Sequence, residues 1–508
     1  MFTDAHYSLI SKPWIGVRWR DQDEGPPAVG LRDALVHANR IAALTTGPPP
    51  ALSALYRILY ALTARVTGLD EARKGRDDWL DRRNDVLEAG FDSDRVDAYL
   101  EPLHHRFDLF GEHPFLQDPR LAEECPKPAG VNKLVFGRPA GNNHVWFGHH
   151  RDADPQPLHP EEAVLHLLMW LYYGPSGRCG TRNVGQTSAA DVSAGPLRSS
   201  LSYHPEGSCL LETLLAGLVA PTTTDRADSD LCPWEVQALP DPLNPEKPGE
   251  GVCSRLTGGW QHAVLLVPGE GGASVDDAYV TWARRTKPPR AEDAYLIWQI
   301  SQQGNAYPRP ADSGRALWRD LDALLLAKAT GSAQPRRPAV LSSTAELEEV
   351  LDHLTVRTLG FEQDGKTKDV QFVSGRTPAV LHFLGEPEIA RSIGDLRQAG
   401  ELYGRRLDWA VKRAWAGVTA AKKAEECAWS EQAAALYWPG AEQAFWARVH
   451  TRSFDDGWRD FRRLAVDIFE RVTRAAPPTP RAMRAVEAAR PELYGGRKRK
   501  QAAAAPTA

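Results

Sequence analysis

The stretch HPEEAVLHLLMWLYY, residues 159–173, predicts a helix that leads directly into a segment rich in glycine and serine. Pro160 lies in the first turn, where a missing backbone N–H costs nothing. Glu161 and Glu162 complement the positive end of the helix dipole. The periodic pattern stops at Tyr173, so we expect regular structure to end there and an irregular segment to begin.

The segment that follows is YGPSGRCGTRNVGQTSAADVSAGPLRSS, residues 173–200. It carries Arg178, Arg182 and Arg198 but one acid, Asp191. One interpretation is a flexible surface loop, because glycine and serine are common in such loops. The other is a backbone that approaches a ligand closely, which glycine permits because it has no Cβ. A DNA minor groove is only about 6 Å wide, so a glycine turn fits where a side chain would clash.

The chain before this segment predicts further helices and strands. Alternation over 6–20 predicts a strand pair, and apolar residues recur at helical spacing over 30–44. Pro48–Pro50 precede an amphipathic helix whose apolar face consists of Leu52, Leu55, Tyr56, Leu59, Leu62 and Val66. Residues 104–160 lack periodicity, which is typical of a long functional or disordered loop.

After the glycine-rich segment, 237–251 is rich in proline and glycine and predicts a linker or long loop. We expect strands at Ala263–Val267 and Tyr279–Ala283, and a helix over 315–329. From about residue 386 the pattern is almost wholly helical, with helices expected over 386–416, 419–437, 440–474 and 479–490. Short connections between four helices indicate an antiparallel bundle.

The sequence therefore predicts an α+β fold. Residues 1–375 form a large mixed N-terminal domain with irregular loops, 386–495 form an all-α C-terminal four-helix bundle, and 496–508 form a disordered basic tail. No apolar run reaches the roughly 18 residues that a membrane span needs. Six cysteines lie far apart without a CxxC pair, which is typical of a cytoplasmic chain with reduced thiols.

A hairpin is predicted in LGFEQDGKTKDVQFV, residues 359–373. Asp364-Gly365 is a strong two-residue turn signal between apolar runs. One interpretation is an ordinary hairpin. The other is a stiff tip whose amide contacts base edges and whose lysines contact phosphates, projecting Gln363, Asp364, Lys366 and Lys368.

Catalytic motifs are scarce in this chain. There is no phosphate-binding Walker loop, no GxSxG and no HExxH. A metal-dependent hydrolase could be built only on the histidine-rich stretch 104–150, which holds His104, His105, His113, His144, His149 and His150. Zinc sites usually have more tightly paired ligands, so we expect no metal, no cofactor and no enzyme activity. A helical interaction scaffold without DNA contact is a further alternative.

Taken in order, seven segments resemble the CasA family, the large subunit of the type I-E CRISPR Cascade complex. They are SLISKPWIGVRW (8–19), GLRDAL (30–35), FDLFGEHPFLQ (107–117), the glycine segment (174–187), GGWQHAVLLV (258–267), YPRPADSGRALWRDLDALL (307–325) and the hairpin (359–373). The resemblance implies a non-catalytic subunit that recognises the protospacer-adjacent motif (PAM) in double-stranded DNA and opens the duplex for crRNA pairing. Implied partners are crRNA-containing Cascade subunits, target DNA with its PAM, and a helicase–nuclease.

The resemblance also implies three groups of DNA-binding residues. The glycine loop falls at Gly174, Ser176, Gly177 and Arg178, and the wedge hairpin at Gln363, Asp364, Gly365, Lys366 and Lys368. A basic residue on the minor groove would be Arg284, Arg285 or Lys287. Fewer glycines occupy the loop here than in some relatives, and the wedge glutamine is Gln363 or is replaced.

The net charge of −5 predicts that the isolated chain binds DNA weakly. Other subunits would then supply most of the phosphate neutralisation. We expect strong binding only in the assembled complex, measured by gel shift on short duplexes at physiological salt. Nanomolar binding by the free chain would contradict this prediction.

Overall fold

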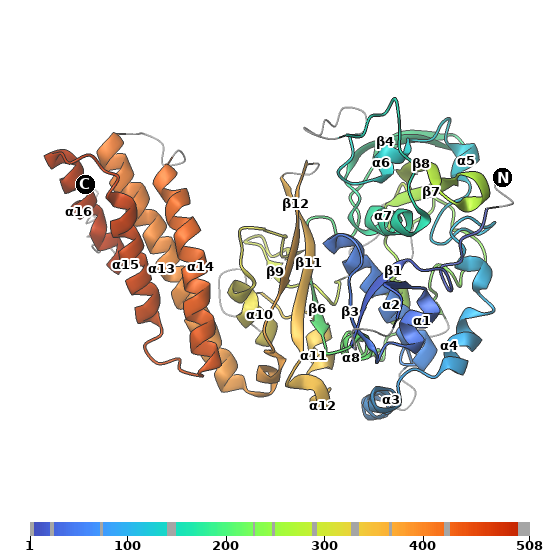
Figure 1. The fold of residues 1–508 in the computed structure, drawn as a ribbon, viewed down its shortest axis with the longest axis horizontal. Helices are drawn as coiled ribbons and strands as arrows, with labels where there is room; N and C mark the ends of the chain where they lie inside the picture. Colours follow the sequence, from blue (N-terminus) through green and yellow to red (C-terminus); the bar gives the residue numbers. More distant parts are fainter. Residues whose placement is uncertain are drawn as a thin grey trace, which may run out of the picture. The chain divides into compact units, whose positions relative to one another are not determined.

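The computed structural model describes residues 5–495 except 21–24, 72–74, 140–148, 227–228, 246–248, 287–291, 327–334, 365–367 and 421–426 (Figure 1). The chain divides into two compact units. The N-terminal unit contains Met1–Ser313 and Ala333–His382, and the C-terminal unit contains Gly314–Ser332 and Phe383–Ala508. Residues 314–332 thus belong with the C-terminal helices, not with the predicted domain 1–375. The predicted tail, 496–508, lies outside the described residues.

Helix α2 (Pro49–Thr67) is the centre of the N-terminal unit. It contacts α7, α8, α9, α4 and the β11–β12 hairpin. The helix was predicted with one apolar face, but 17 of its 19 residues are buried. The reason is its central position, because a helix covered on all sides must bury its polar face as well. The buried Arg57 is accommodated by an ion pair with Asp293 at 2.8 Å.

The strands of the N-terminal unit form small antiparallel sheets. One has the order β12-β11-β6, from Lys368–Arg376, Thr355–Asp364 and Leu201–Glu206. A second has the order β2-β1-β3, from Ala28–Val29, Ile15–Trp19 and Ile41–Leu44. Three two-stranded pairs are β4-β5 (Gly177–Val184, Thr187–Val192), β7-β8 (His262–Pro268, Val275–Trp282) and β9-β10 (Trp298–Ile300, Ala306–Pro308).

The remaining helices of this unit are short, apart from α3 and α7. They are α1 (Leu31–Val36), α3 (Arg76–Ala89), α4 (Ser93–Leu100), α5 (Leu121–Glu124), α6 (Val131–Leu134), α7 (Pro160–Tyr173), α8 (Leu210–Ala216), α9 (Val252–Leu256), α11 (Val340–Thr344) and α12 (Glu348–Leu351). Helix α7 and the strands β7 and β8 confirm the predictions from periodicity.

Three local predictions for this unit are wrong. Residues 6–20 hold one strand, β1, whose partners β2 and β3 come from later in the chain. The helical pattern over 30–44 ends at Val36, and Ile41–Leu44 pair with β1 as strand β3. The segment after α7 is not a loop but the hairpin β4–β5. In the first two cases pairing with a distant segment outweighs the weak local preference, and in the third β4 and β5 pair with each other within the segment.

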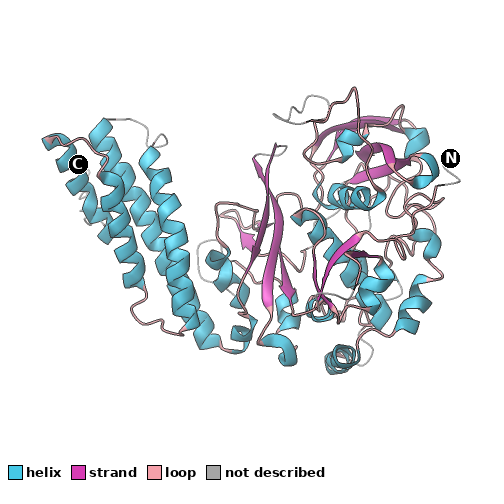
Figure 2. Cartoon of the chain, viewed as in Figure 1, coloured by secondary structure: helices cyan, strands magenta, loops and turns pink. Residues whose placement is uncertain are grey.

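The regular elements of the described C-terminal unit are all helical (Figure 2). They are α10 (Leu321–Leu325), α13 (Pro387–Thr419), α14 (Ala428–His450), α15 (Trp458–Thr473) and α16 (Pro480–Ala489), with short 3-10 turns. Helix α13 packs against α14, α15 and α16, and α14 packs against α15. No described helix has the length and apolar character needed to cross a membrane.

Several predicted helix boundaries in this unit are wrong. Helix α13 continues to Thr419 past the break expected at 417–418, and the helix predicted over 440–474 is interrupted between His450 and Trp458. Helix α14 continues through Pro439 and Gly440, where a break was expected, and ends at His450. A Cβ on Gly440 would lie 3.1 Å from the side chain of Leu464 on α15, so packing between the helices explains the glycine. The predicted helix 315–329 is a 3-10 turn over Leu317–Asp320 followed by α10, and 327–329 lie outside the described residues.

Trp318 packs the described part of the segment 314–332, residues 314–326, against the C-terminal helices. Its indole is fully buried and lies 4.8 Å from the ring of Phe445 and 6.3 Å from that of Phe461, measured between ring centroids. A Cβ on Gly400 would lie 2.7 Å from the indole, so α13 approaches it without a gap. Beside it, Arg319 donates to Glu401 of α13 at 2.7 Å.

We predict that Trp318→Ala lowers the free energy of unfolding by about 3–5 kcal/mol, because it leaves a large cavity. Trp409 on α13 is 70% exposed and provides the matched control. Trp409→Ala should change stability by less than about 0.5 kcal/mol. Urea denaturation of the whole chain measures both variants, and equal effects would contradict the packing role of Trp318.

Candidate nucleic-acid interface

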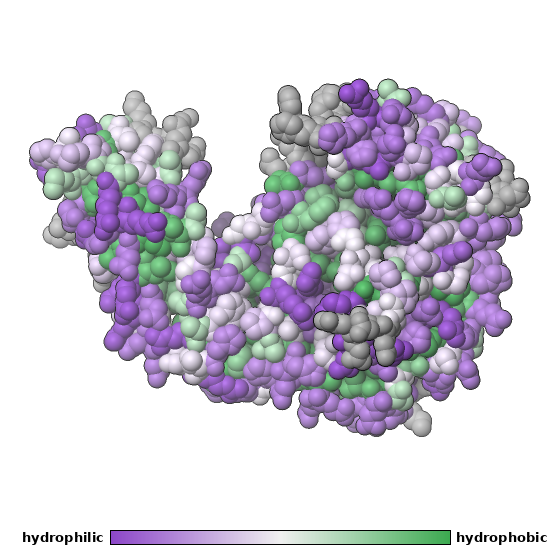
Figure 3. Space-filling model, viewed as in Figure 1, coloured by the Kyte–Doolittle hydropathy of each residue, from purple (hydrophilic) through white to green (hydrophobic). Residues whose placement is uncertain are grey.

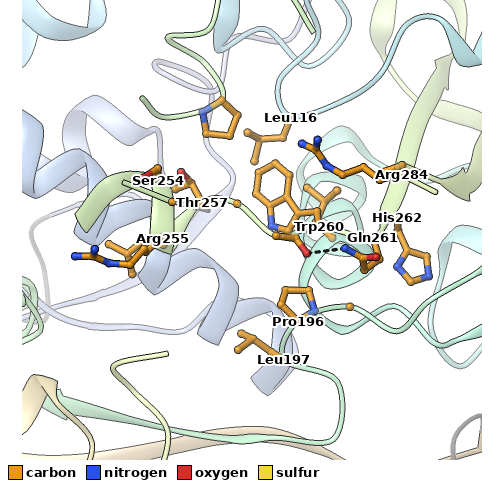
Figure 4. Close-up of a pocket in the computed structure, with 18 of the residues that line it drawn as sticks. Leu116, Pro196, Leu197, Ser254, Arg255, Thr257, Trp260, Gln261, His262 and Arg284 are labelled. Carbon is orange, nitrogen blue, oxygen red and sulfur yellow. Dashed lines mark hydrogen bonds between the residues drawn. The ribbon is translucent and has the colours of Figure 1, made fainter. Parts of the chain in front are cut away.

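A cavity of about 1400 Å³ in the N-terminal unit brings together three segments that were predicted to contact DNA. Ser176 of the glycine segment, Arg284 after β8 and Gln363 of β11 all line it. Figure 4 shows Trp260 within the cavity, between Leu116 and Pro196, with Arg284 nearby. These residues come from distant parts of the sequence, and the fold places them around one space.

The charges of the cavity wall are balanced. Among the described residues, five arginines and five carboxylates line it, namely Arg106, Arg120, Arg198, Arg255 and Arg284, and Asp118, Asp241, Glu250, Glu292 and Asp293. Several are already paired, such as Arg120 with Asp118 at 2.8 Å. The described part of the wall therefore offers no net positive charge to a polyanion, and recognition by these residues depends on shape and on individual donors.

The glycine turn has one buried and one exposed glycine. Gly174 is buried, and a Cβ there would lie 2.5 Å from the ring of His262. Its lack of a side chain is explained by this packing, so we leave Gly174 out of the proposed contact surface. Gly177 is exposed with a φ of 123°, a conformation that favours glycine. Arg178 is exposed, and within the described part of the chain it has no ion-pair partner.

His262 at the start of β7 holds the glycine turn in place. Its Nε2 donates to the carbonyl oxygen of Pro175 at 3.0 Å, and its ring packs against Trp170 of α7 at 5.4 Å between centroids. Burial lowers the pKa of His262 to about 4, although the bond to Pro175 favours the protonated form. The imidazole is therefore neutral at physiological pH.

The predicted hairpin is present as β11 and β12. Their last register pair is Asp364 with Lys368, so a two-residue Asp364-Gly365 turn is wrong. Gly365 and Lys366 lie outside the described residues, as do the side chains of Asp364 and Lys368. The register shifts between Glu362 and Gln363, which marks an irregularity in the strand near its end.

The Gln363 side chain is held by a neighbouring carboxylate. Its Nε2 donates to Asp369 Oδ1 on the facing strand at 3.0 Å. The same oxygen accepts from Arg198 Nη2. Burial lowers the pKa of Arg198 to about 10 and raises the pKa of Asp369, and the attraction between the two groups opposes both shifts.

The three basic candidates after β8 differ in their surroundings. Arg284 lines the cavity. Arg285 already binds other parts of the protein. Its Nη1 donates to the carbonyl oxygen of Asp191 at 2.9 Å, and its guanidinium lies 5.1 Å from the Trp282 ring centroid. Lys287 lies outside the described residues. Of the two that the structure describes, Arg284 is the one that lines the cavity.

Sequence reasoning missed Trp260 and Gln261 as site residues, although their segment GGWQ was noted. Both line the cavity, and the Nε1 atom of Trp260 is buried without a hydrogen-bond partner among the described residues. An aromatic ring after two glycines could have indicated a lining residue, because glycines leave space around it.

The histidine-rich stretch does not form a metal site in the described part of the chain. No group of three His, Cys, Asp or Glu residues there is arranged to hold a metal ion. The rings of His104, His105 and His113 lie near one another, at 5.6 and 6.1 Å between successive centroids. His144 lies outside the described residues.

Comparisons with known proteins agree on one family. A family model described as CRISPR-associated protein Cse1 matches residues 8–476. The CRISPR-associated protein CasA/Cse1 of Thermus thermophilus is 26% identical over 491 residues, covering 90% of each chain. A chain of a CRISPR RNA-guided surveillance complex is 41% identical, with a TM-score of 0.88 over 96% of this chain and 100% of that chain. Cse1 of Thermobifida fusca has the same fold at 21% identity, with a TM-score of 0.77 over 97% of this chain and 98% of that chain.

The α+β fold with a helical C-terminal region is thus that of the large CRISPR-associated subunits. This chain belongs to the Cse1 family, the CasA subunits of type I-E systems. The resemblance inferred from the order of its motifs is confirmed.

We predict that His262 makes the stability of the chain depend on pH. Its pKa is about 4 when folded and near 6.5 when unfolded, so the unfolded state binds the proton first as the pH falls. Protonation of His262 in the unfolded state should therefore lower the free energy of unfolding by about 2 kcal/mol between pH 7.5 and pH 5. His262→Gln should lose that part of the pH dependence, as measured by urea denaturation at both values. An unchanged pH dependence in the variant would contradict the assignment.

Proposed function

We propose that this chain is the non-catalytic DNA-recognition subunit of a type I-E surveillance complex in the cytoplasm. It reads the PAM in double-stranded DNA, helps open the adjacent duplex for crRNA pairing, and helps recruit the helicase–nuclease. The observation that carries the proposal is the convergence of Ser176, Arg284 and Gln363 on one cavity. Protein contacts then read a short motif, and base pairing with the guide reads the rest of the target.

The three groups have different roles in this proposal. The exposed backbone at Gly177, with Ser176 and Arg178 beside it, approaches the minor groove. Arg284 contacts the backbone or a base edge from the cavity wall. Gln363 stands near the end of a long hairpin whose strands pair from Arg357 with Arg376 to Asp364 with Lys368. A paired hairpin is stiff, so it loses little entropy when it enters the duplex.

The C-terminal helices α13, α14, α15 and α16 are proposed to form a four-helix bundle that holds the displaced strand and helps recruit the helicase–nuclease. On α13, Trp409 is 70% exposed, and Arg405 is exposed one turn away on the same face. An exposed aromatic ring beside a cation suits single-stranded DNA, which stacks its bases and carries phosphates. Apolar patches lie among polar surface over these helices in Figure 3.

The two alternatives predict different measurements. A metal-dependent hydrolase would purify with stoichiometric zinc or iron, although no fitting cluster occurs among the described residues. A helical scaffold without DNA contact would leave the gel shift of the assembled complex unchanged when this chain is omitted. Neither alternative is favoured by a specific observation.

We predict that Gln363→Ala slows R-loop formation on an intact, PAM-containing duplex by roughly tenfold. Opening the first base-pair step costs on the order of 1–2 kcal/mol of stacking, and an inserted side chain offsets about that amount. The same variant should react normally with a target already unpaired beside the PAM, since that opening is complete. Stopped-flow or gel assays of the assembled complex measure both rates. Equal impairment on both targets would contradict the wedge role.

A further inference from the structure

Arg198 connects the glycine turn to the wedge hairpin. It lies between β5 and β6 and is 6% exposed. Its Nη1 donates to the carbonyl oxygen of Tyr173 at 2.9 Å, directly before Gly174. Its Nη2 donates to Asp369 on β12, a residue 171 positions later in the chain. One buried guanidinium thus binds the start of the first DNA-binding segment and the side of the second.

Asp369 extends this connection to the wedge glutamine. Gln363 and Asp369 are register partners on β11 and β12, and the Gln363 amide donates to Asp369 Oδ1 at 3.0 Å. The pairing falls where the register shifts, so the backbone ladder alone does not fix the direction of Gln363. The carboxylate provides that constraint, and Arg198 in turn fixes the carboxylate.

The segment that carries Arg198 has little freedom to move. On one side, Gly195 N donates to Gly174 O at 2.9 Å and Leu197 N donates to Tyr172 O at 2.9 Å. On the other side, a Cβ on Gly360 of β11 would lie 2.7 Å from the Ser200 carbonyl oxygen. A displacement of the glycine turn would therefore be transmitted through this segment to β11.

The Arg198 guanidinium also packs on an aromatic residue of the hairpin. It lies 5.1 Å from the ring centroid of Phe361, and Phe361 packs on Phe372 across the strand pair at 4.8 Å. Planar stacking on Phe361 and paired donors on opposite sides use features that lysine lacks. This geometry is specific to arginine at this position.

We infer that Arg198 and Asp369 are positioning residues that hold Gln363 in the direction needed for strand separation and couple it to the glycine turn. This inference rests on the proposed function, in which Gln363 is the wedge. The pair acts through Gln363 and does not itself touch DNA. Loss of the Arg198–Asp369 pair should therefore impair the opening of the first base pairs and leave the later pairing of crRNA with the target strand intact.

The test measures R-loop formation by the assembled, crRNA-loaded complex on two PAM-containing targets. One target is an intact duplex, and the other is already unpaired beside the PAM. Asp369→Ala and Arg198→Met should each slow the reaction on the intact duplex by about tenfold, equivalent to about 1.4 kcal/mol. Both should react at the wild-type rate on the unpaired target. Methionine retains the apolar contact with Phe361 but cannot bind Asp369 or Tyr173.

Arg376→Met is the matched control on the same hairpin. Arg376 forms an ion pair with Glu206 at 2.9 Å at the opposite end of β12, away from Gln363. It should leave both rates unchanged. Combining Asp369→Ala with Gln363→Ala should be no slower than Gln363→Ala alone, because the two residues act in one step.

Several outcomes would overturn the inference. Slowing by Gln363→Ala but not by Asp369→Ala or Arg198→Met would reject the coupling and retain the wedge. Slowing on both targets would show a merely structural role, and multiplicative effects in the double variant would show independent action. If Gln363→Ala has no effect on the intact duplex, the wedge assignment fails and the inference fails with it. If Asp369→Ala does not assemble, the result for Arg198→Met decides.

Discussion

The burial of nearly all of α2 is the constraint on which the N-terminal unit depends. A helix covered on nearly all sides needs internal partners for most of the polar groups that it carries. Arg57 pairs with Asp293, and Ser53 accepts a hydrogen bond from Tyr173 at 3.0 Å. Tyr173 is the last residue of α7, so the same contacts that satisfy α2 also fix the point where the glycine turn begins.

After Tyr173, close packing at two glycines shapes the candidate site. Gly174 rests on His262, and Gly195 rests on Tyr172, with no room for a Cβ at either position. Glycine was expected in this segment because a ligand must come close. At Gly174 the close neighbour is instead the ring of His262. This packing fixes the position of Ser176 and Gly177, which follow in the chain.

The charges of this chain give it little general attraction for a polyanion. Among the described residues of the cavity wall there are as many carboxylates as arginines, and the whole chain has a net charge of −5. A surface of this kind discriminates by shape and by individual hydrogen bonds, while most phosphate attraction must come from elsewhere. This balance agrees with the proposed function, in which the chain recognises DNA as part of a larger assembly.

Periodicity in the sequence was enough to locate α2, α7 and the strands β7 and β8, because each repeats a local pattern over several residues. The β11–β12 hairpin was located by a turn signal between apolar runs, although the turn itself is longer than predicted. The order of its motifs was enough to indicate the family. The tertiary structure alone decided that 173–200 forms a hairpin, that Trp318 belongs with the C-terminal helices, and that Asp369 holds Gln363. The Arg198–Asp369 contact joins residues 171 positions apart, and no local pattern encodes a partner at that distance.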